Sequence, residues 1–217
     1  MRLARPHRAD PHPPTADRET RGRILEVAEG LFIDRGFKGV SMKEVATAVQ
    51  VTPAALYYHF PGGKDELFVE TIRQFLHAMI ERAFRGIEST PDFRARLTLL
   101  TRNVLTTPID RLAPLMRDAH GYLEKAKPDL MSEIATTFGR RATELFQEAM
   151  DADEVSPAVP ADLLATLHQG MCIALLNRRH LFGQERIAPG DDERLAQTLV
   201  AVLLDGVGPT PPALPTP

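Results

Sequence analysis

The stretch "SMKEVATAVQVTPAALYYHF", residues 41–60, carries the signals for two short helices with a tight break between them. "SMKE" has the pattern of a capping box, in which Ser41 caps the first helix and Glu44 reaches back to the cap. Thr52 is a preferred N-cap residue, and Pro53 suits the first position of the second helix because no N–H is needed there. The pattern therefore predicts a helix, a short break and a second short helix.

Two short helices joined in this way outline a helix-turn-helix. In that motif the N-terminal residues of the second helix enter the DNA major groove. Leu56 and Phe60 are spaced to face a core, which leaves Tyr57, Tyr58 and His59 on the other faces of the helix. Hydroxyls, imidazoles and a helix N-terminus are all groups that position a protein on phosphates. We therefore expect this segment to bind double-stranded DNA.

The candidate DNA contacts come from both helices, the break and the start of the next helix: Lys43, Gln50, Thr52, Pro53, Ala54, Tyr57, Tyr58, His59 and Lys64. A structural alternative stays open for several of them. Tyr57 and Tyr58 can be half-buried helix residues with no partner. Lys43 and Lys64 can be solvated charges, and His59 can be a structural histidine.

Apolar residues at helical spacing predict helices on both sides of this motif. One helix begins at Thr20 and stops near Gly36, and a long amphipathic helix covers 64–85. Further helices are expected to open at Pro91, Pro108, Pro128, Pro160 and Asp191. Because no alternating run rich in β-branched residues is present, no strand is predicted. The expected fold is all-α with about nine helices.

Residues 20–68 resemble the DNA-binding region of TetR-type transcriptional regulators. That family has an apolar I-L-x-x-A-x-x-L-F stripe and a "GF" stop, then T/S-x-x-x-I-A, a turn, V-S-x-G-x-L-Y-x-H-F, and a lysine and a leucine in the next helix. The matching positions are Ile24, Leu25, Ala28, Leu31, Phe32, Gly36, Phe37, Ser41, Val45, Ala46, Val51, Thr52, Leu56, Tyr57, His59, Phe60, Lys64 and Leu67. The resemblance implies a larger helical C-terminal domain that forms dimers and binds a small molecule.

Two positions depart from the family pattern. The turn glycine of the family is Gln50 here, and the glycine early in the second helix is Ala54. If Gln50 takes a left-handed conformation, it costs about 1 kcal/mol relative to glycine. The second helix has no Arg, Lys or Asn, so bidentate reading of guanine by this helix is not expected. Methyl contacts, tyrosine contacts and DNA shape are expected to carry the specificity instead.

The chain is expected to divide into four parts. Residues 1–17 are a flexible basic arm, and residues 18–63 are the helix-turn-helix domain. Residues 64–207 are a helical ligand-binding and dimerisation domain that starts with a connecting helix (64–85), and residues 208–217 are a disordered proline-rich tail. Residues 1–64 carry ten basic and seven acidic side chains, whereas residues 65–217 carry sixteen and twenty-two. The basic excess therefore lies in the part expected to meet DNA. The arm can also enter a minor groove through Arg2, Arg5 and Arg8.

Composition sets limits on the cellular setting. Cys172 is the only cysteine, which excludes an intrachain disulfide and fits the reducing cytoplasm. The basic, proline-rich N-terminus has no apolar segment of the kind found in a secretory signal, and no apolar run reaches the length of a membrane span. The expected location is cytoplasmic, with no membrane partner.

The C-terminal half offers candidates rather than motifs. Polar and methionine side chains that can line a ligand site are Asn103, Met116, Arg117, His120, Tyr122, His168 and Met171. The resemblance implies that two apolar helices pair with their copies in a dimer, although they can instead be ordinary core. The candidate dimer contacts are Leu164, Leu167, Gly170, Met171, Ala174, Leu175, Leu195, Leu199 and Leu203. His168 and Cys172 share one helical face, but two ligands do not make a metal site, so no metal or cofactor is predicted.

The leading functional hypothesis is a repressor that binds a palindromic operator as a homodimer and is released by a small molecule. Activation, or ligand-strengthened DNA binding, stays open. One alternative is a helical interaction protein with a structural helix-turn-helix and a protein partner. An enzyme is not expected, because the sequence has no G-x-G-x-x-G, G-x-x-x-x-G-K-[ST], H-E-x-x-H, C-x-x-C or G-x-S-x-G motif.

Overall fold

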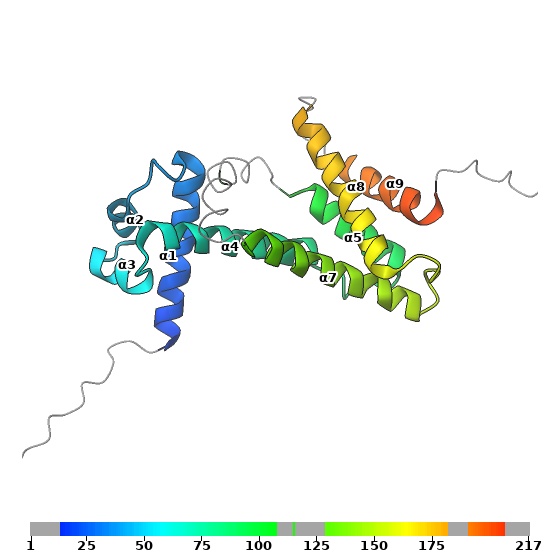
Figure 1. Cartoon of the computed structure of the whole chain (residues 1–217), viewed down its shortest axis with the longest axis horizontal. Coiled ribbons are helices and arrows are strands. Elements are labelled where there is room, and N and C mark those ends of the chain that lie inside the picture. The colour runs from blue at the N-terminus through cyan, green and yellow to red at the C-terminus, as the bar shows by residue number, and fades with distance from the viewer. Residues whose placement is uncertain (1–13, 108–114, 116–128, 182–190, 207–217) are drawn as a thin grey trace, which may run out of the picture. The chain divides into compact units, whose positions relative to one another are not determined.

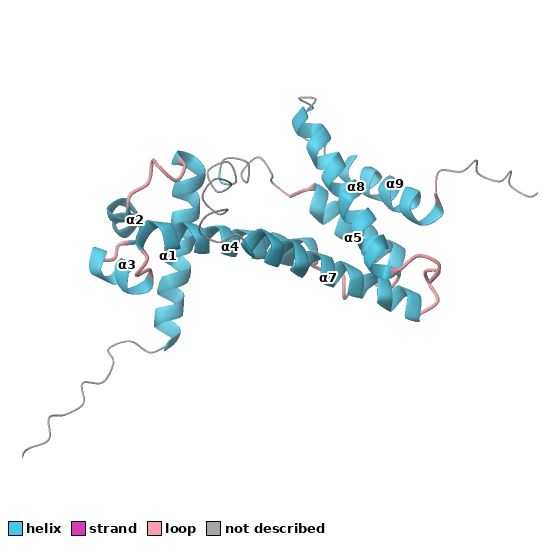
Figure 2. Cartoon of the chain, viewed as in Figure 1, coloured by secondary structure: helices cyan, strands magenta, loops and turns pink. Residues whose placement is uncertain are grey.

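The computed structural model describes residues 14–107, 115, 129–181 and 191–206, and these residues form helices and their connections (Figures 1 and 2). The described helices are α1 (Pro14–Arg35), α2 (Met42–Val49), α3 (Pro53–His59), α4 (Gly63–Ala83), α5 (Phe93–Leu105), α7 (Asp129–Asp151), α8 (Ala161–Leu181) and α9 (Asp191–Asp205). No strand occurs in this part of the chain, which confirms the all-α prediction. The helix predicted to open at Pro108 lies outside the described residues.

The chain forms two compact units. Unit 1 comprises residues 1–75 with 110–128, and unit 2 comprises residues 76–109 with 129–217. Among the described helices, unit 1 holds α1, α2, α3 and the first part of α4. Unit 2 holds the rest of α4 with α5, α7, α8 and α9. The division at residue 64 stays a prediction, since α4 runs past it as one continuous helix.

The core of unit 1 is made by the apolar positions that the helical spacing singled out. Ile24 and Phe32 of α1 are fully buried, as are Leu56 of α3 and Phe68 of α4. The Phe32 and Phe68 rings meet edge to face, with centroids 4.9 Å apart, an arrangement favoured by the ring quadrupole. Burial of these side chains holds the helix-turn-helix against α1 and the start of α4.

Helix α1 begins earlier than predicted. It opens at Pro14 and has Asp17 in its first turn, whereas the spacing of apolar residues placed the start at Thr20. Proline suits the first turn of a helix, and an acidic residue there interacts favourably with the helix dipole. The helix therefore extends beyond the apolar stripe that was used to find it.

In unit 2, α7 packs along α8, and α5 packs along α9 and also contacts α8. The rings of Phe93 in α5 and Phe146 in α7 meet at 5.2 Å. The prolines predicted to open these helices lie just before them. Helix α5, for example, is capped by Asp92, whose carboxylate accepts the Ala95 N–H at 2.9 Å. The Asp92 side chain supplies the hydrogen-bond acceptor of the cap, since the side chain of the preceding Pro91 has none.

Candidate nucleic-acid interface

The first helix of the motif is fixed at its N-terminus by the predicted capping box. Ser41 Oγ accepts the Glu44 N–H at 3.3 Å, and Glu44 Oε2 accepts the Ser41 N–H at 2.9 Å. The Ser41 hydroxyl also donates to Glu44, and these bonds lower the pKa of the Glu44 carboxyl. Arg35 at the end of α1 donates to the same carboxylate at 3.2 Å. The start of α2 is therefore anchored to α1.

The turn contains the residue that departs from the family pattern. Gln50 has φ 62° and ψ 41°, the left-handed conformation that glycine adopts freely. Its N–H donates to Thr47 O at 3.2 Å, and the Val51 N–H donates to Ala46 O at 2.9 Å, which is the Schellman arrangement. The turn thus keeps the geometry of the glycine version, at a cost of about 1 kcal/mol.

Helix α3 presents a polar and aromatic surface to solvent. Thr52 Oγ1 accepts the Ala55 N–H at 3.1 Å and so fixes the first turn. Leu56 is fully buried, whereas Tyr57 and Tyr58 are 50% and 74% exposed. Of the other candidates, the exposed residues are Lys43, Gln50, Thr52, Pro53 and Ala54. A short helix that is capped by Thr52 and carries two exposed phenols has the form of a DNA-reading element.

His59 is placed differently from the tyrosines. Its side chain is only 7% exposed, and Nδ1 lies 3.6 Å from the Asp17 carboxylate of α1. The Tyr58 ring meets it edge to face at 5.3 Å. The imidazole therefore links α3 to α1, and the phosphate contact expected at this position stays a prediction.

Lys64 lies at the start of α4, in the first turn after the motif. Its Nζ sits 4.3 Å above the centre of the Phe37 ring, a cation–π contact that orients the side chain. Gly63, just before it, has φ 69° and allows the sharp entry into the helix. Lys64 is thus half-buried and held in place, whereas Lys43 is exposed.

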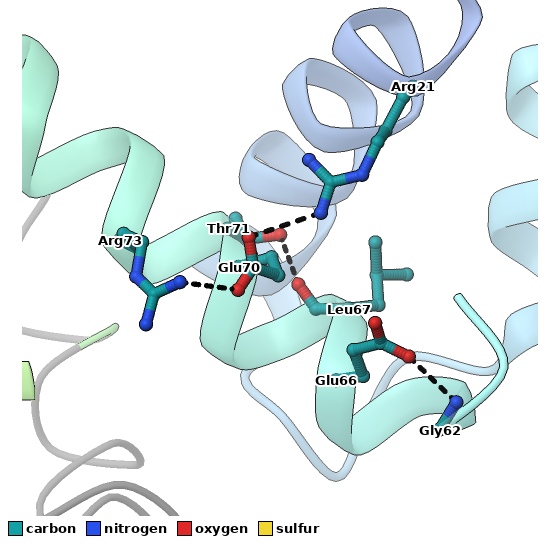
Figure 3. Close-up of polar contacts among 7 residues, drawn as sticks. All are labelled: Arg21, Gly62, Glu66, Leu67, Glu70, Thr71 and Arg73. Carbon is teal, nitrogen blue, oxygen red and sulfur yellow. Dashed lines mark hydrogen bonds and ion pairs between the residues drawn. The ribbon is translucent and has the colours of Figure 1, made fainter. Parts of the chain in front are cut away.

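The start of α4 is fastened by a set of polar contacts (Figure 3). Glu66 Oε2 accepts the Gly62 N–H at 2.7 Å and closes the turn that follows α3. Glu70 accepts from Arg21 of α1 at 3.1 Å and from Arg73 at 2.9 Å. These contacts hold α4 against α1 and fix the turn that follows α3.

The structure describes three of the predicted ligand contacts. Asn103 Nδ2 donates to Ala83 O at 3.1 Å and to Arg85 O at 3.2 Å, so it caps the end of α4. His168 is fully buried and Met171 is half-buried. The remaining candidates lie outside the described residues: Met116, Arg117, His120 and Tyr122. Arg2, Arg5 and Arg8 of the arm also lie outside them.

The predicted dimer contacts form part of an exposed stripe on α8. Leu167, Gly170 and Ala174 face solvent, whereas Leu164 and Leu199 are buried inside unit 2. Leu175, Leu195 and Leu203 are partly exposed. Leu163, in the apolar segment expected to pair with a second copy, is 47% exposed, and Ile173 of the same helix is 48% exposed. The spacing 163, 167, 170 and 174 was the signal that places Leu163 on this face.

The described residues contain no group of three or more His, Cys, Asp and Glu side chains arranged to hold a metal ion. None of the described helices is long and apolar enough to cross a membrane.

Residues 24–71 match the family model described as bacterial regulatory proteins, tetR family. The transcriptional activator FasR of Mycolicibacterium smegmatis is 32% identical over 79 residues, which cover 36% of this chain and 36% of FasR. The transcriptional repressor KstR2 of Mycobacterium tuberculosis is 31% identical over 77 residues, which cover 36% of this chain and 38% of KstR2. The chain thus spans little more than a third of the length of these curated relatives.

The helical fold is shared over a greater length. A TetR-family transcriptional regulator from Mesorhizobium loti superposes with a TM-score of 0.71, covering 87% of this chain and 96% of that structure at 22% identity. The sequence match covers the helix-turn-helix, and the structural match also covers helices of unit 2. Residues 24–71 are thus similar to the tetR family of bacterial regulatory proteins, and the longer structural likeness shows that the helical fold is shared.

Proposed function

We propose that the protein is a ligand-responsive repressor that binds a palindromic operator as a homodimer and leaves it when a small molecule binds. The observation that carries the proposal is the surface of α3, where Thr52, Tyr57 and Tyr58 are exposed on a helix capped at its N-terminus. The curated relatives that match are transcription regulators, so no enzymatic role is proposed.

DNA contact by α3 follows from its chemistry. The dipole of the helix places a positive partial charge at its N-terminus, which attracts phosphate, and Lys43 adds a positive charge near the start of α2. Ala54 and the tyrosine rings offer apolar contacts to thymine methyl groups. With no Arg, Lys or Asn on α3, base reading rests on these contacts and on DNA shape.

Dimerisation is supported by the exposed stripe on α8. Leu163, Leu167 and Ile173 are large apolar side chains in solvent, and Gly170 and Ala174 between them allow close approach of a second helix. A two-fold dimer built on this stripe would carry two copies of α3. These would reach half-sites about 34–36 Å apart or a multiple of that distance.

Release by a ligand is a shift between two arrangements of the dimer. One arrangement holds the two α3 helices at operator spacing and the other does not. A ligand that binds the second arrangement more tightly lowers DNA affinity, by no more than its difference in affinity for the two. The sign is open to measurement, since the curated relatives include an activator and a repressor.

The test is selection from a random DNA pool with the full-length protein at near-physiological salt, followed by sequencing of the retained DNA. A palindrome is expected. The affinity for that palindrome should then fall steeply as salt rises, because bound phosphates release counterions. No enriched sequence from an intact dimer would contradict the proposal and favour a protein partner instead.

A matched pair of charge changes locates the interface. Lys43→Gln should weaken binding to the selected palindrome and reduce the salt slope by about 1, as expected for one lost phosphate contact. Arg82→Gln removes the same charge from the exposed face of α4 in unit 2 and should leave both quantities unchanged. Equal effects of the two substitutions would remove α2 and α3 from the interface.

A further inference from the structure

Unit 2 buries a histidine in the middle of α8. His168 has no exposed surface, and Cys172, one turn later on the same helix, is 1% exposed. The imidazole faces Thr101 of α5, which is also fully buried. A buried ionisable side chain is uncommon unless it has partners, so each polar atom of this cluster needs an acceptor or a donor.

The hydrogen bonds around Thr101 fix the tautomer of the imidazole. Thr101 Oγ1 lies 2.7 Å from the Leu97 carbonyl oxygen and 2.8 Å from His168 Nε2. The carbonyl can only accept, so the single hydroxyl proton goes to Leu97. The second short contact then requires that Nε2–H donates to Thr101 Oγ1. In the neutral imidazole this leaves Nδ1 without a proton, as a bare acceptor.

Nδ1 has no hydrogen-bond partner among the described residues, although it is completely buried. Burial lowers the pKa of His168 to about 4, so the ring stays neutral at physiological pH. Burial also raises the pKa of Cys172 to about 12, which keeps the thiol protonated and makes it a poor metal ligand. The His168 and Cys172 side chains are therefore uncharged, and Nδ1 lacks a described hydrogen-bond donor.

We propose that Nδ1 of His168 accepts a hydrogen bond from the effector, which is an uncharged, largely apolar molecule with a hydroxyl or amide N–H donor. This inference rests on the proposed function, because it names the ligand class of that regulator. An ammonium or carboxylate group would lose its hydration here without gaining an opposite charge. A neutral donor instead completes a buried polar network that is otherwise one bond short.

Two isomeric probes separate the hydrogen bond from the apolar contact. 1-Hexanol and methyl pentyl ether have the same atoms and similar apolar surface, but only the alcohol can donate. Full-length protein labelled with ¹⁵N reports the two imidazole nitrogens of His168 directly. Without a probe, Nε2 should carry the proton. With 1-hexanol, the Nδ1 resonance should shift towards that of a hydrogen-bonded acceptor, and the alcohol should bind about tenfold more tightly than the ether.

Two variants and one functional measurement complete the test. His168→Leu should abolish the preference for the alcohol, and Cys172→Ala, which keeps both imidazole nitrogens, should retain it. The proposal would be overturned if the two probes bind equally tightly or if neither binds. An unchanged Nδ1 resonance with 1-hexanol would also overturn it, because water would then be the partner of Nδ1. Operator binding is measured on the same samples. If the wild-type protein binds the operator but the probes leave the Nδ1 resonance of His168 unchanged, this inference alone is refuted. If the wild-type protein does not bind an operator at all, the proposed function is refuted.

Discussion

The helix-turn-helix and the helices of unit 2 are both amphipathic, but they are specified in different ways. In residues 41–60 every boundary is marked by a local contact, such as the capping box at Ser41 and the cap at Thr52. In unit 2 the helices are long, and pairs distant in sequence, such as α5 with α9, meet through their apolar faces. The helix caps of the first region thus use neighbouring residues, while the second region keeps a buried acceptor at His168 that lacks a described partner. Local caps therefore fix the helix ends of the first region, whereas long-range packing decides which buried polar groups of the second region find partners.

The largest expected effect tests whether the two regions respond separately. Leu56→Ala empties a fully buried position under α3 and should lower the free energy of unfolding of unit 1 by about 2–5 kcal/mol. Amide hydrogen exchange should show α2 and α3 losing protection while α7 and α8 keep theirs. Met131→Ala, at an exposed position of α7, is the control and should have little effect. Equal loss of protection in all four helices would show that the two regions unfold as one cooperative unit, and the contrast between them would not hold.

The pH dependence of stability tests the dry environment of His168. Its pKa is about 4 in the folded protein and about 6.5 when unfolded, so the unfolded state binds more protons between these values. The contribution of His168 to the free energy of unfolding is fully present above about pH 6.5 and is lost as the pH falls towards 4. The loss is about 3 kcal/mol. Denaturant unfolding of wild type and His168→Leu across this range should differ by that amount, and parallel curves would contradict the burial of the ring.

The dimer stripe of α8 is tested by adding a charge to it. Leu167→Glu would bury two carboxylates at a two-fold interface and should weaken dimerisation about 100-fold or more. Sedimentation equilibrium measures the dimer dissociation constant. Ala135→Glu adds the same charge to an exposed position of α7 and should leave that constant unchanged. A dimer that survives Leu167→Glu would place the interface elsewhere.

The smallest expected effect concerns the turn of the helix-turn-helix. Gln50→Gly should raise the stability of the folded protein by about 1 kcal/mol, since glycine adopts the left-handed conformation without strain. Gln50→Ala removes the amide but keeps the strain, so its stability should match that of the wild type. Comparing the operator affinities of the two variants separates the side chain from the backbone. An unchanged affinity in both would remove Gln50 from the predicted DNA contacts.

The helix-turn-helix could be read from the sequence because each of its boundaries depends on neighbouring residues. Ser41 and Glu44 are three positions apart, so their reciprocal bonds follow from the chain itself. Exposure of Tyr57 and Tyr58 follows from the periodicity that buries Leu56. The same reasoning misplaced the start of α1, because the helix continues to Pro14 beyond its apolar stripe.

Several features depended on contacts between residues far apart in the chain. Nothing local to His59 indicated that Asp17 would lie beside it, and nothing local to Asn103 indicated that it would cap α4. The missing partner of His168 Nδ1 depends on the packing of α5 against α8 and on the proton of Thr101. By itself the sequence determined the helices, the capped turn and the face that α3 exposes, since these follow from spacing along one chain segment. Only the tertiary structure decided which polar groups found partners, because burial and hydrogen bonding across helices depend on residues brought together by folding.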